Sequence, residues 1–357
     1  MHIGIPREVK PLEGRVGLIP AACSELVAAG HELSVETGAG RLSGYSDDDY
    51  RAAGATVVDS AEQLYGAAQL IVKVKEPVEQ DLRYLRGDHI LFSYLHLAAN
   101  LSLLKTLQAL GLTAIAFETV QEDDGSLPLL APMSDIAGRL SVQLAARLLH
   151  QPQGGKGLLL GGLPGAERGR VTVIGAGTAG GNATRLAAAM GAELMVFDKK
   201  RERLEAMRAL GDNVTALYPY RDTVEQAVIA ADVVIGAVLI PGARAPHVVS
   251  AEQIRRMQAG SVVVDISVDQ GGCIETTRAT DYRDPTYVVD GVLHLAVTNL
   301  PGAVPRSASQ ALSAAVTPYL LSLAGGRLDE DRALRRGINV RAGSISHPAL
   351  LSLVESN

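Results

Sequence analysis

Cysteine is almost missing from this 357-residue sequence, which contains only Cys23 and Cys273. Two cysteines cannot supply a disulfide framework or a cysteine-based zinc site, and we expect no bound metal. The sequence also lacks an apolar run approaching the roughly 18 residues that cross a bilayer, and its first residues lack the apolar segment of a signal peptide. These absences argue against a membrane protein and favour the cytoplasm.

Basic residues are in the minority, because 33 Lys and Arg stand against 39 Asp and Glu, for a net charge of −6 at pH 7. Such a chain lacks the electrostatic footprint of a nucleic-acid-binding protein. The hydrophobic fraction of 47% and the charged fraction of 20% are ordinary for a globular protein. At this length the chain can form two domains of usual size, so the composition fits a soluble two-domain enzyme.

A glycine-rich turn between a strand and a helix is the most informative stretch. Residues 171–174 form a short, β-branched apolar run that is typical of a strand buried on both faces. Gly175, Gly177 and Gly180 follow at the spacing G-x-G-x-x-G. The first glycine allows a tight turn, the second lets the backbone approach a pyrophosphate, and the third lets the next helix pack closely. The pattern predicts dinucleotide binding, and a glycine-rich turn that binds nothing is the alternative.

An acidic residue ends the next predicted strand. Residues 193–197 form this strand and Asp198 closes it, at about the 20-residue distance from the glycine turn that is typical of such sites. A carboxylate there can accept hydrogen bonds from the ribose hydroxyls of NAD and would repel the 2′-phosphate of NADP. We therefore predict NAD as the cofactor.

Predicted strands and helices alternate along most of the chain, with apolar runs at residues 2–5, 32–36, 70–74, 90–94 and 113–117 and again from residue 171 onwards. Such alternation favours parallel sheets that are covered by helices on both faces. We predict an α/β protein with two doubly wound, Rossmann-like domains that are joined by long helices and have a cleft between them.

Two long helices mark the predicted domain boundaries. The first opens at Ala131 and carries an apolar stripe, and the second, residues 307–323, would return the chain to the first domain. We predict a discontinuous substrate domain, residues 1–130 plus 305–357. Residues 131–304 would form the dinucleotide-binding domain with its linking helix.

Polar residues that follow predicted strands are candidates for a site, because ligands of open α/β sheets bind beyond the carboxyl ends of the strands. Lys73 and Lys75 end one apolar run and, being two residues apart, should point to one face. A pair of surface lysines on an edge strand is the alternative. His96 follows the next run and suits general acid/base catalysis, although a lone histidine on an apolar stretch is more often a core residue.

Two further polar residues lie in loops after predicted strands. Arg15 follows the first strand and could bind a substrate carboxylate through two hydrogen bonds, with a solvated surface arginine as the alternative. Asp269 follows the predicted strand at residues 262–266 and could line the cleft from the nicotinamide side. Asp265, inside that apolar run, is expected to make structural hydrogen bonds.

The sequence resembles the L-alanine dehydrogenase family in motifs that run in order along nearly the whole chain. They are Gly-Ile-Pro-Arg-Glu at residues 4–8, Lys-Val-Lys-Glu-Pro at 73–77, Leu-His-Leu at 95–97, Leu-Ala-Pro-Met-Ser at 130–134, Ile-Gly-Ala-Gly-Thr-Ala-Gly at 174–180, Ile-Gly-Ala-Val-Leu-Ile-Pro-Gly at 235–242 and Asp-Ile-Ser-Val-Asp-Gln-Gly-Gly at 265–272. The resemblance implies reversible, NAD-dependent oxidative deamination of L-alanine to pyruvate and ammonia. It also implies a homo-oligomer, usually a homohexamer.

The resemblance also implies roles for individual residues. Arg15 and Lys75 would bind the substrate, and His96 and Asp269 would be the catalytic acid/base pair, with the step performed by each left open. Met133 and Tyr94 are candidate walls of a small methyl pocket. The expected dinucleotide contacts are Ser134, Gly175, Gly177, Gly180, Asp198, Arg203, Leu239, Val297 and Asn299.

Three alternatives compete with this interpretation. The NAD(H)-binding subunit of proton-translocating transhydrogenase binds the cofactor without substrate chemistry of its own, and it typically replaces the residues that correspond to Lys75 and His96. Lysine-forming saccharopine dehydrogenase shares the fold but matches the motifs less well. A protein that only senses the cofactor would have no reason to place Lys75, His96 and Asp269 at three separate strand ends.

Overall fold

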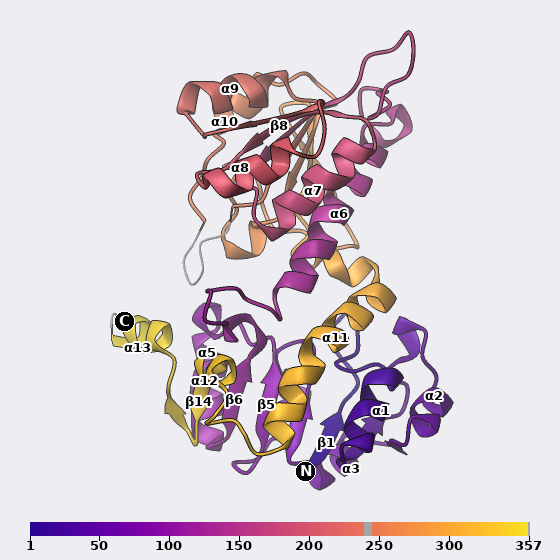
Figure 1. Ribbon diagram of the computed structural model, residues 1–357, viewed down its shortest axis with the longest axis vertical. Helices are drawn as coiled ribbons and strands as arrows, with labels where there is room; N and C mark the ends of the chain where they lie inside the picture. The colour runs from indigo at the N-terminus through magenta and orange to yellow at the C-terminus, as the bar shows by residue number, and fades with distance from the viewer. Residues whose placement is uncertain (239–244, 356–357) are drawn as a thin grey trace. The chain divides into compact units, whose positions relative to one another are not determined.

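The computed structural model describes residues 1–238 and 245–355, and the chain divides into two compact units (Figure 1). Unit 1 comprises Met1–Met133 and Val304–Asn357, and unit 2 comprises Ser134–Ala303. The chain leaves unit 1 within helix α6 (Ala131–Leu148) and has rejoined it before helix α11 (Pro305–Ala324). Unit 1 is therefore discontinuous in sequence.

Unit 1 is built on an eight-stranded sheet with the order β15-β14-β6-β5-β4-β1-β2-β3. Strands β1 to β6 pair in parallel, and β14 and β15 continue the sheet in antiparallel pairs. The strands are β1 (His2–Ile5), β2 (Glu32–Glu36), β3 (Thr56–Val58), β4 (Leu70–Val72), β5 (Ile90–Ser93), β6 (Thr113–Ala116), β14 (Ile338–Arg341) and β15 (Ser344–Ile345).

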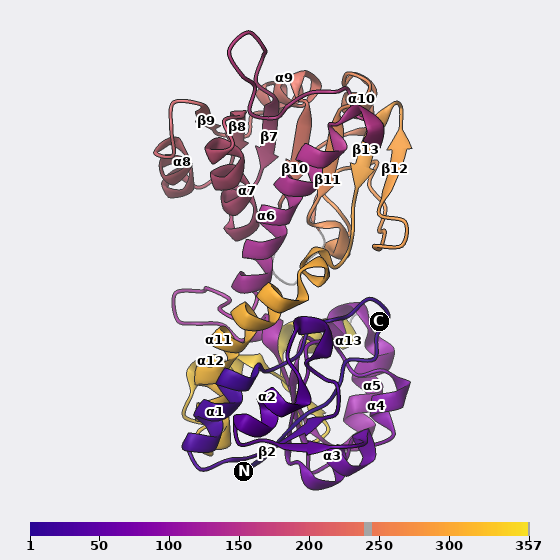
Figure 2. The ribbon, with the colours of Figure 1, turned by 90° about the vertical axis from the view of Figure 1, so that its right-hand side faces the viewer.

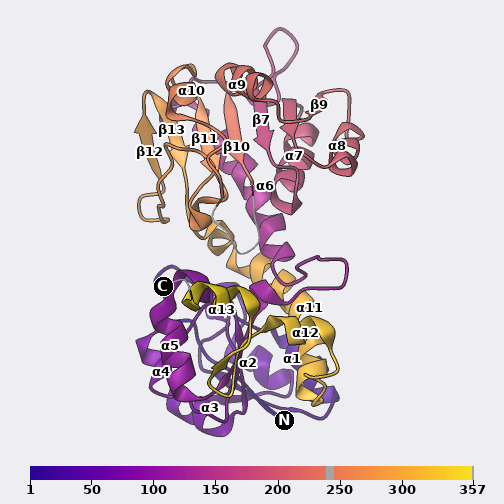
Figure 3. The same cartoon turned by 90° about the vertical axis from the view of Figure 1, so that its left-hand side faces the viewer.

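Helices cover both faces of this sheet, with α3, α4 and α5 on one face and α1 and α11 on the other (Figures 2 and 3). Helix α5 packs through Leu103, Leu104 and Leu107 against strand residues such as Leu91, because these leucines recur on one side of the helix. The remaining elements are α1 (Pro20–Ala28), α2 (Asp47–Ala52), α3 (Ala61–Ala67), α4 (Glu79–Leu82), α5 (Leu101–Leu110), α12 (Arg332–Gly337) and α13 (Pro348–Glu355), with the short 3-10 turns η1 (Arg41–Ser43), η2 (Leu97–Ala99) and η3 (Phe117–Thr119).

Unit 2 contains a seven-stranded sheet with the order β12-β13-β11-β10-β7-β8-β9. All neighbours pair in parallel except the antiparallel edge strand β12. The elements are β7 (Arg170–Ile174), β8 (Glu193–Phe197), β9 (Val214–Leu217), β10 (Val233–Gly236), β11 (Val262–Asp265), β12 (Thr286–Val289), β13 (Val292–Leu295), α7 (Thr178–Ala189), α8 (Arg201–Arg208), α9 (Arg221–Ala230), α10 (Ala251–Arg255), η4 (Gln151–Gln153), η5 (Val268–Gln270) and η6 (Leu300–Ala303).

The central strands of unit 2 are apolar on both faces. In β10, Val233 and Ile235 belong to one buried cluster and Val234 to another. In β11, Val262 and Val264 likewise belong to the first cluster, and Val263 belongs to the second. Because successive strand residues point to opposite faces, each face is covered by its own core. The predicted doubly wound α/β class is confirmed.

Ser46 and Asp49 have the spacing that predicts a capping box, and this capping box is present at the start of α2. The Ser46 hydroxyl accepts a hydrogen bond from the Asp49 amide at 3.2 Å, and the Asp49 carboxylate accepts one from the Ser46 amide at 2.7 Å. Two backbone donors at the helix terminus are thereby satisfied.

Three segments show how far local patterns reach. The glycine content of residues 151–165 predicts a hairpin or a loop, and the structure has a loop there that begins with η4. The apolar run at residues 293–297 predicts a strand, which is present at Val292–Leu295 and pairs with β12, for which no strand is predicted. The tail beyond Gly325, which has no sequence assignment, forms α12, β14, β15 and α13. Strand β14 pairs with β6, and such a long-range contact has no local signal in the sequence.

Within residues 1–238 and 245–355, no helix is long and apolar enough to cross a membrane. The same residues contain no group of three or more His, Cys, Asp or Glu side chains that could hold a metal ion.

Candidate functional site

The glycine turn of unit 2 joins β7 to α7, and the structure accounts differently for the presence of glycine at each of its three positions. Gly175 has a φ of 95°, and a Cβ there would lie 2.5 Å from the carbonyl oxygen of Ala237, so only glycine fits. A Cβ at Gly180 would overlap the carbonyl oxygen of Gly175, so α7 can pack on the turn only without one. Gly177 differs, because the nearest atom beyond its chain neighbours would be 3.7 Å from a Cβ. Packing within unit 2 therefore does not require glycine at this position.

The first turn of α7 is suited to an anion. Gly177 is the N-cap residue, and no side chain in the described part of the chain caps the helix there. Uncapped N–H groups and the positive end of the helix dipole attract phosphate groups. Together with the open space at Gly177, this terminus fits a dinucleotide pyrophosphate.

Asp198 follows β8 and contacts the glycine turn directly. One carboxylate oxygen accepts hydrogen bonds from the Ala176 amide at 2.8 Å and from Nη1 of Arg203 at 3.2 Å. The other oxygen accepts from the Lys200 amide at 2.9 Å. A carboxylate offers about four acceptor positions, so these three donors leave room for a ribose hydroxyl. Asp198 thus both fixes the turn and can still bind a ligand.

The other predicted dinucleotide contacts are spread over unit 2. Ser134 lies half-buried in the first turn of α6. Val297 is buried beyond the end of β13, and the backbone carbonyl of Asn299 accepts a hydrogen bond from Gly302. Leu239 lies outside the described residues.

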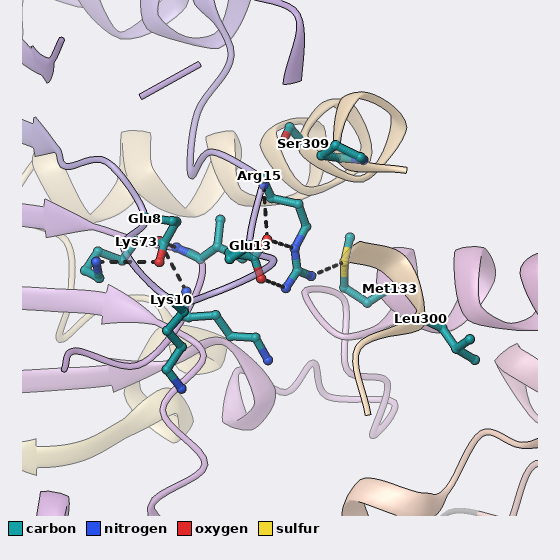
Figure 4. Close-up of polar contacts among 12 residues, drawn as sticks. Glu8, Lys10, Glu13, Arg15, Lys73, Met133, Leu300 and Ser309 are labelled. Carbon is teal, nitrogen blue, oxygen red and sulfur yellow. Dashed lines mark hydrogen bonds and ion pairs between the residues drawn. The ribbon is translucent and has the colours of Figure 1, made fainter. Parts of the chain in front are cut away.

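Arg15 lies in the loop after β1 and is 3% exposed, so the alternative of a solvated surface arginine is wrong. Its Nε and Nη2 atoms donate to the two carboxylate oxygens of Glu13 at 2.6 and 2.5 Å, and Nη1 lies 3.2 Å from the sulfur of Met133 (Figure 4). Burial lowers the pKa of Arg15, but the hydrogen bonds and charge of Glu13 outweigh burial and raise it. A guanidinium has five N–H groups, so two remain for a carboxylate beyond these contacts.

The two lysines that follow β4 have different environments. Strand β4 ends at Val72, so both lysines lie just beyond its carboxyl end, and β4 lies between β1 and β5, so the edge-strand alternative is wrong. Lys73 is 1% exposed and pairs with Glu8 at 3.6 Å and with Asp81 at 3.2 Å. Burial lowers the pKa of Lys73, but these two carboxylates outweigh burial and raise it. Lys73 is therefore fully engaged in the core of unit 1.

Lys75 is only half-buried and lies close enough to Arg15 to be affected by its charge. Burial is the main cause that lowers the pKa of Lys75, and the positive charge of Arg15 adds to it. Two neighbouring cations that repel each other form a natural site for an anion. Of the two lysines, Lys75 is thus the one available for a ligand.

His96 is exposed and follows β5, so the alternative of a core histidine is wrong. Its ring lies parallel to that of Tyr94, with 6.0 Å between centroids and 7° between planes. The buried Tyr94 hydroxyl donates to the carbonyl oxygen of Leu129 at 2.5 Å, which fixes this ring. His96 itself has the left-handed backbone angles φ 49° and ψ 40°. Such strain in a residue with a side chain costs on the order of 1–3 kcal/mol and is concentrated at functional sites.

Asp269 is exposed in η5, in the loop after β11. Asp265, at the end of β11, is fully buried and organises this loop. Its carboxylate accepts hydrogen bonds from the amides of Ser267 at 2.9 Å and Cys273 at 2.9 Å, among other donors. The structural role expected for Asp265 is confirmed, and this role fixes both ends of the turn that contains Asp269.

Comparison with known proteins shows which family has this fold and these motifs. The model of the alanine dehydrogenase/PNT N-terminal domain matches residues 4–137, and that of the C-terminal domain matches residues 141–348. The chain belongs to the alanine dehydrogenase/PNT family. The C-terminal family model runs past Val304, where the chain rejoins unit 1, so the family domains and the compact units divide the chain differently.

Among curated members of the alanine dehydrogenase/PNT family, the chain is 48% identical over 357 residues to alanine dehydrogenase of Geobacillus stearothermophilus, covering 98% of this chain and 95% of that protein. It is 45% identical over 356 residues to alanine dehydrogenase of Halomonas elongata, covering 98% and 96%. A solved structure of L-alanine dehydrogenase matches with a TM-score of 0.96 and 48% identity, covering 100% of this chain and 99% of that chain. Transhydrogenase from Sinorhizobium meliloti matches with a TM-score of 0.85 and 26% identity, covering 98% and 100%.

The predicted site residues of this alanine dehydrogenase/PNT family member fall into two groups. Unit 1 contains Arg15, in the loop between β1 and α1, and Lys75 and His96, which lie shortly beyond the ends of the neighbouring parallel strands β4 and β5. Unit 2 contains the glycine turn with Asp198 and Arg203, as well as Asp269.

Sequence reasoning missed the carboxylates that surround the cations of unit 1. Glu13 forms a bidentate pair with Arg15, Glu8 pairs with Lys73, and Glu118 accepts a hydrogen bond from the backbone of His96. A signal existed for Glu8 and Glu13, because both lie in a strongly charged loop directly after a strand. Glu118 carried the same signal, because it directly follows the apolar run at residues 113–117, and its contact is with the end of the neighbouring strand β5.

Proposed function

We propose that this family member catalyses the reversible, NAD-dependent oxidative deamination of L-alanine to pyruvate and ammonia. The curated relatives named alanine dehydrogenase, which cover 98% of the chain, support the proposal. The structural observation that carries it is the buried guanidinium of Arg15, which Glu13 holds through two hydrogen bonds, together with the half-buried Lys75 of the same unit, whose pKa the charge of Arg15 helps to lower. A small 2-oxo acid offers a carboxylate and a carbonyl oxygen to two such cations.

Arg15 binds the substrate carboxylate in this proposal. Glu13 holds one edge of the guanidinium and keeps it charged despite burial, so the remaining N–H groups have a fixed direction. Lys75 donates a hydrogen bond to the same end of the molecule and polarises the ketone oxygen of pyruvate. Met133 contacts Arg15 and the ring of Tyr94 is held in place by its hydroxyl, so both suit the walls of a pocket for the methyl group.

His96 and Asp269 perform the proton transfers. The amine of alanine must be neutral before hydride can leave Cα, and the resulting iminium must then be attacked by water, so a base is needed twice. The exposed imidazole of His96 accepts and returns these protons, and the carboxylate of Asp269 orients water or ammonia. The reverse division between the two residues remains the alternative.

The cofactor is NAD, and unit 2 contains the groups that suit it. The N–H groups at the start of α7 would bind the pyrophosphate beside Gly177, and Asp198 would accept from the ribose hydroxyls, with Arg203 next to it. Ser134, Gly175, Gly180, Leu239, Val297 and Asn299 complete the proposed contacts. When bound, the nicotinamide ring accepts hydride from the substrate Cα.

The nicotinamide-binding subunit of a transhydrogenase is the second candidate function. The transhydrogenase structure shares the fold at 26% identity, against 48% for the L-alanine dehydrogenase structure. Lys75, His96 and Asp269, which substrate chemistry requires, are all present in this chain. We therefore favour the dehydrogenase, and we include in the proposal a cytoplasmic location, a homohexameric assembly and the division into a substrate domain and a dinucleotide-binding domain.

A coupled pair of assays tests the proposal. The purified protein should reduce NAD in the presence of L-alanine at alkaline pH and oxidise NADH in the presence of pyruvate and ammonia. If it binds NADH but turns over neither substrate set, the transhydrogenase-type function is favoured instead. Sedimentation velocity of the same sample should report a hexamer.

A further inference from the structure

The hydrogen-bond ladder between β5 and β6 continues past the strand ends through a side chain. The two strands pair in register up to Ser93 and Ala116, and β6 then turns directly into η3. Beyond this point the carboxylate of Glu118 takes the place of a backbone acceptor. It accepts from the His96 amide at 2.6 Å and from the Leu95 amide, which lies 3.2 Å from each oxygen.

The same arrangement occurs between β4 and β1. Strand β4 ends at Val72, and the Lys73 amide still donates to the carbonyl oxygen of Phe92 in β5, whereas the next two amides, those of Val74 and Lys75, donate to a side chain. One oxygen of Glu8, which lies in the loop after β1, accepts from the Val74 amide at 2.6 Å and from the Lys75 amide at 3.3 Å. The other oxygen of Glu8 pairs with the buried Lys73 at 3.6 Å (Figure 4). Lys73 therefore fixes Glu8, and Glu8 fixes the backbone of Lys75.

Each carboxylate thus holds two successive amides, and in both cases the second amide belongs to a residue with a proposed functional side chain. A carboxylate that accepts from backbone N–H groups makes charge-assisted hydrogen bonds, which are stronger than neutral ones. At His96 this restraint acts on a backbone in the left-handed region, a conformation that persists only where its surroundings impose it. Neither glutamate needs to touch a substrate to have this effect.

We propose that Glu8 and Glu118 are positioning residues that fix Lys75 and His96 through their backbone amides. The proposal deepens the function proposed above and rests on the roles given there to Lys75 and His96. It predicts that each glutamate matters to catalysis only through its own partner.

The first experiment uses Glu118→Gln, which keeps the shape but replaces one acceptor oxygen with a donor amide. We expect kcat for pyruvate reduction to fall about 10- to 100-fold, the scale expected for a group displaced by about 1 Å. The Kd for NADH should stay at the wild-type value. Glu122→Gln is the matched control, because Glu122 is a nearby carboxylate that accepts from the Tyr319 hydroxyl instead of strand-end amides. Its kcat should remain at the wild-type value.

A double-mutant cycle separates positioning from general damage. In a His96→Ala background, Glu118→Gln should lower kcat by no more than about twofold, because the group that it positions is gone. An equal loss in both backgrounds overturns the proposal for Glu118. Glu8→Gln is tested in the same way against Lys75→Ala, with KM for pyruvate as the readout and the melting temperature recorded beside it. If loss of the Lys73 pair prevents Glu8→Gln from folding, the Glu118 cycle still decides the proposal.

Amide hydrogen exchange tests the positioning without reference to catalysis. Glu118→Gln should speed exchange at Leu95 and His96, and Glu8→Gln should speed it at Val74 and Lys75, each without effect at the other pair. Unchanged exchange rates at these amides would overturn the positioning role of the two glutamates and leave the proposed function untouched. If His96→Ala instead keeps full activity, the role proposed for His96 fails, and with it the positioning of a catalytic group, whatever the exchange rates are.

Discussion

Replacement of Gly177 by alanine should separate ligand binding from folding. The residue has φ −68° and ψ −163°, which alanine adopts without strain, and its Cβ would meet nothing closer than 3.7 Å beyond its chain neighbours. The smaller conformational freedom of alanine in the unfolded chain favours the folded state by about 0.4–1 kcal/mol, and this gain offsets the cost of alanine as a poorer N-cap residue than glycine. The melting temperature should therefore stay the same or rise slightly.

Binding of NADH should suffer, because the new methyl group occupies the space where we place the pyrophosphate. Hydrogen bonds to charged groups contribute about 1.5–3 kcal/mol each. Loss of one such bond corresponds to a roughly 10- to 150-fold higher Kd for NADH, at about 1.4 kcal/mol for each factor of ten. Titration of NADH fluorescence measures this Kd, and a scanning thermal melt of the same sample measures stability.

Gly180→Ala is the matched control in the same turn. Its Cβ would overlap the carbonyl oxygen of Gly175, so α7 must move and the melting temperature should fall. Overpacking of this kind costs about 1–3 kcal/mol. If Gly177→Ala bound NADH as tightly as the wild type, the turn would not hold the pyrophosphate and the reasoning would be refuted.

Three further predictions concern cofactor choice, chemistry and pH. Asp198→Asn removes the charge that repels a 2′-phosphate, so the preference for NAD over NADP, measured as a ratio of kcat/KM values, should narrow; an unchanged ratio would show that Asp198 does not set it. His96→Ala and Asp269→Asn should each lower kcat by about 10²–10⁴-fold while NADH binding survives. Wild-type kcat in both variants would contradict the catalytic roles of His96 and Asp269. Arg15→Ala should mainly raise KM for pyruvate. Burial and the charge of Arg15 lower the pKa of Lys75 below its usual 10.5, so the cation is lost as pH rises through that lowered value. KM for pyruvate, measured at a fixed concentration of neutral ammonia, should rise in that window, and a flat profile would exclude Lys75 as a substrate ligand.

Local sequence patterns predicted the central strands and the glycine turn well, because these features depend on neighbouring residues. The strands β1 and β2 lie at the expected residues, since short apolar runs with flanking turn residues specify them. Edge strands were harder to predict. Strand β12 is partly exposed at the edge of its sheet, where it pairs with β13, and β14 owes its place to pairing with β6 far away in sequence.

The site was predictable where a side chain follows an apolar run, as for Lys75 and His96. The sequence could not distinguish the roles of the two lysines, because the carboxylates that pair with the buried Lys73 come from other segments, Glu8 from the loop after β1 and Asp81 from α4. Nor could it show that Arg15 is buried against Glu13, since a charged loop after a strand is usually solvated. Contacts between elements decided each of these cases.

Transfer of deuterium tests the central claim most directly. The purified protein is incubated with NAD and L-alanine that carries deuterium on Cα, and the reduced cofactor is analysed by mass spectrometry. We expect the cofactor to gain one deuterium at C4 of the nicotinamide while pyruvate and ammonia form in equal amounts. Reduced cofactor without deuterium, or no reduction at all, would contradict hydride transfer from L-alanine by this protein.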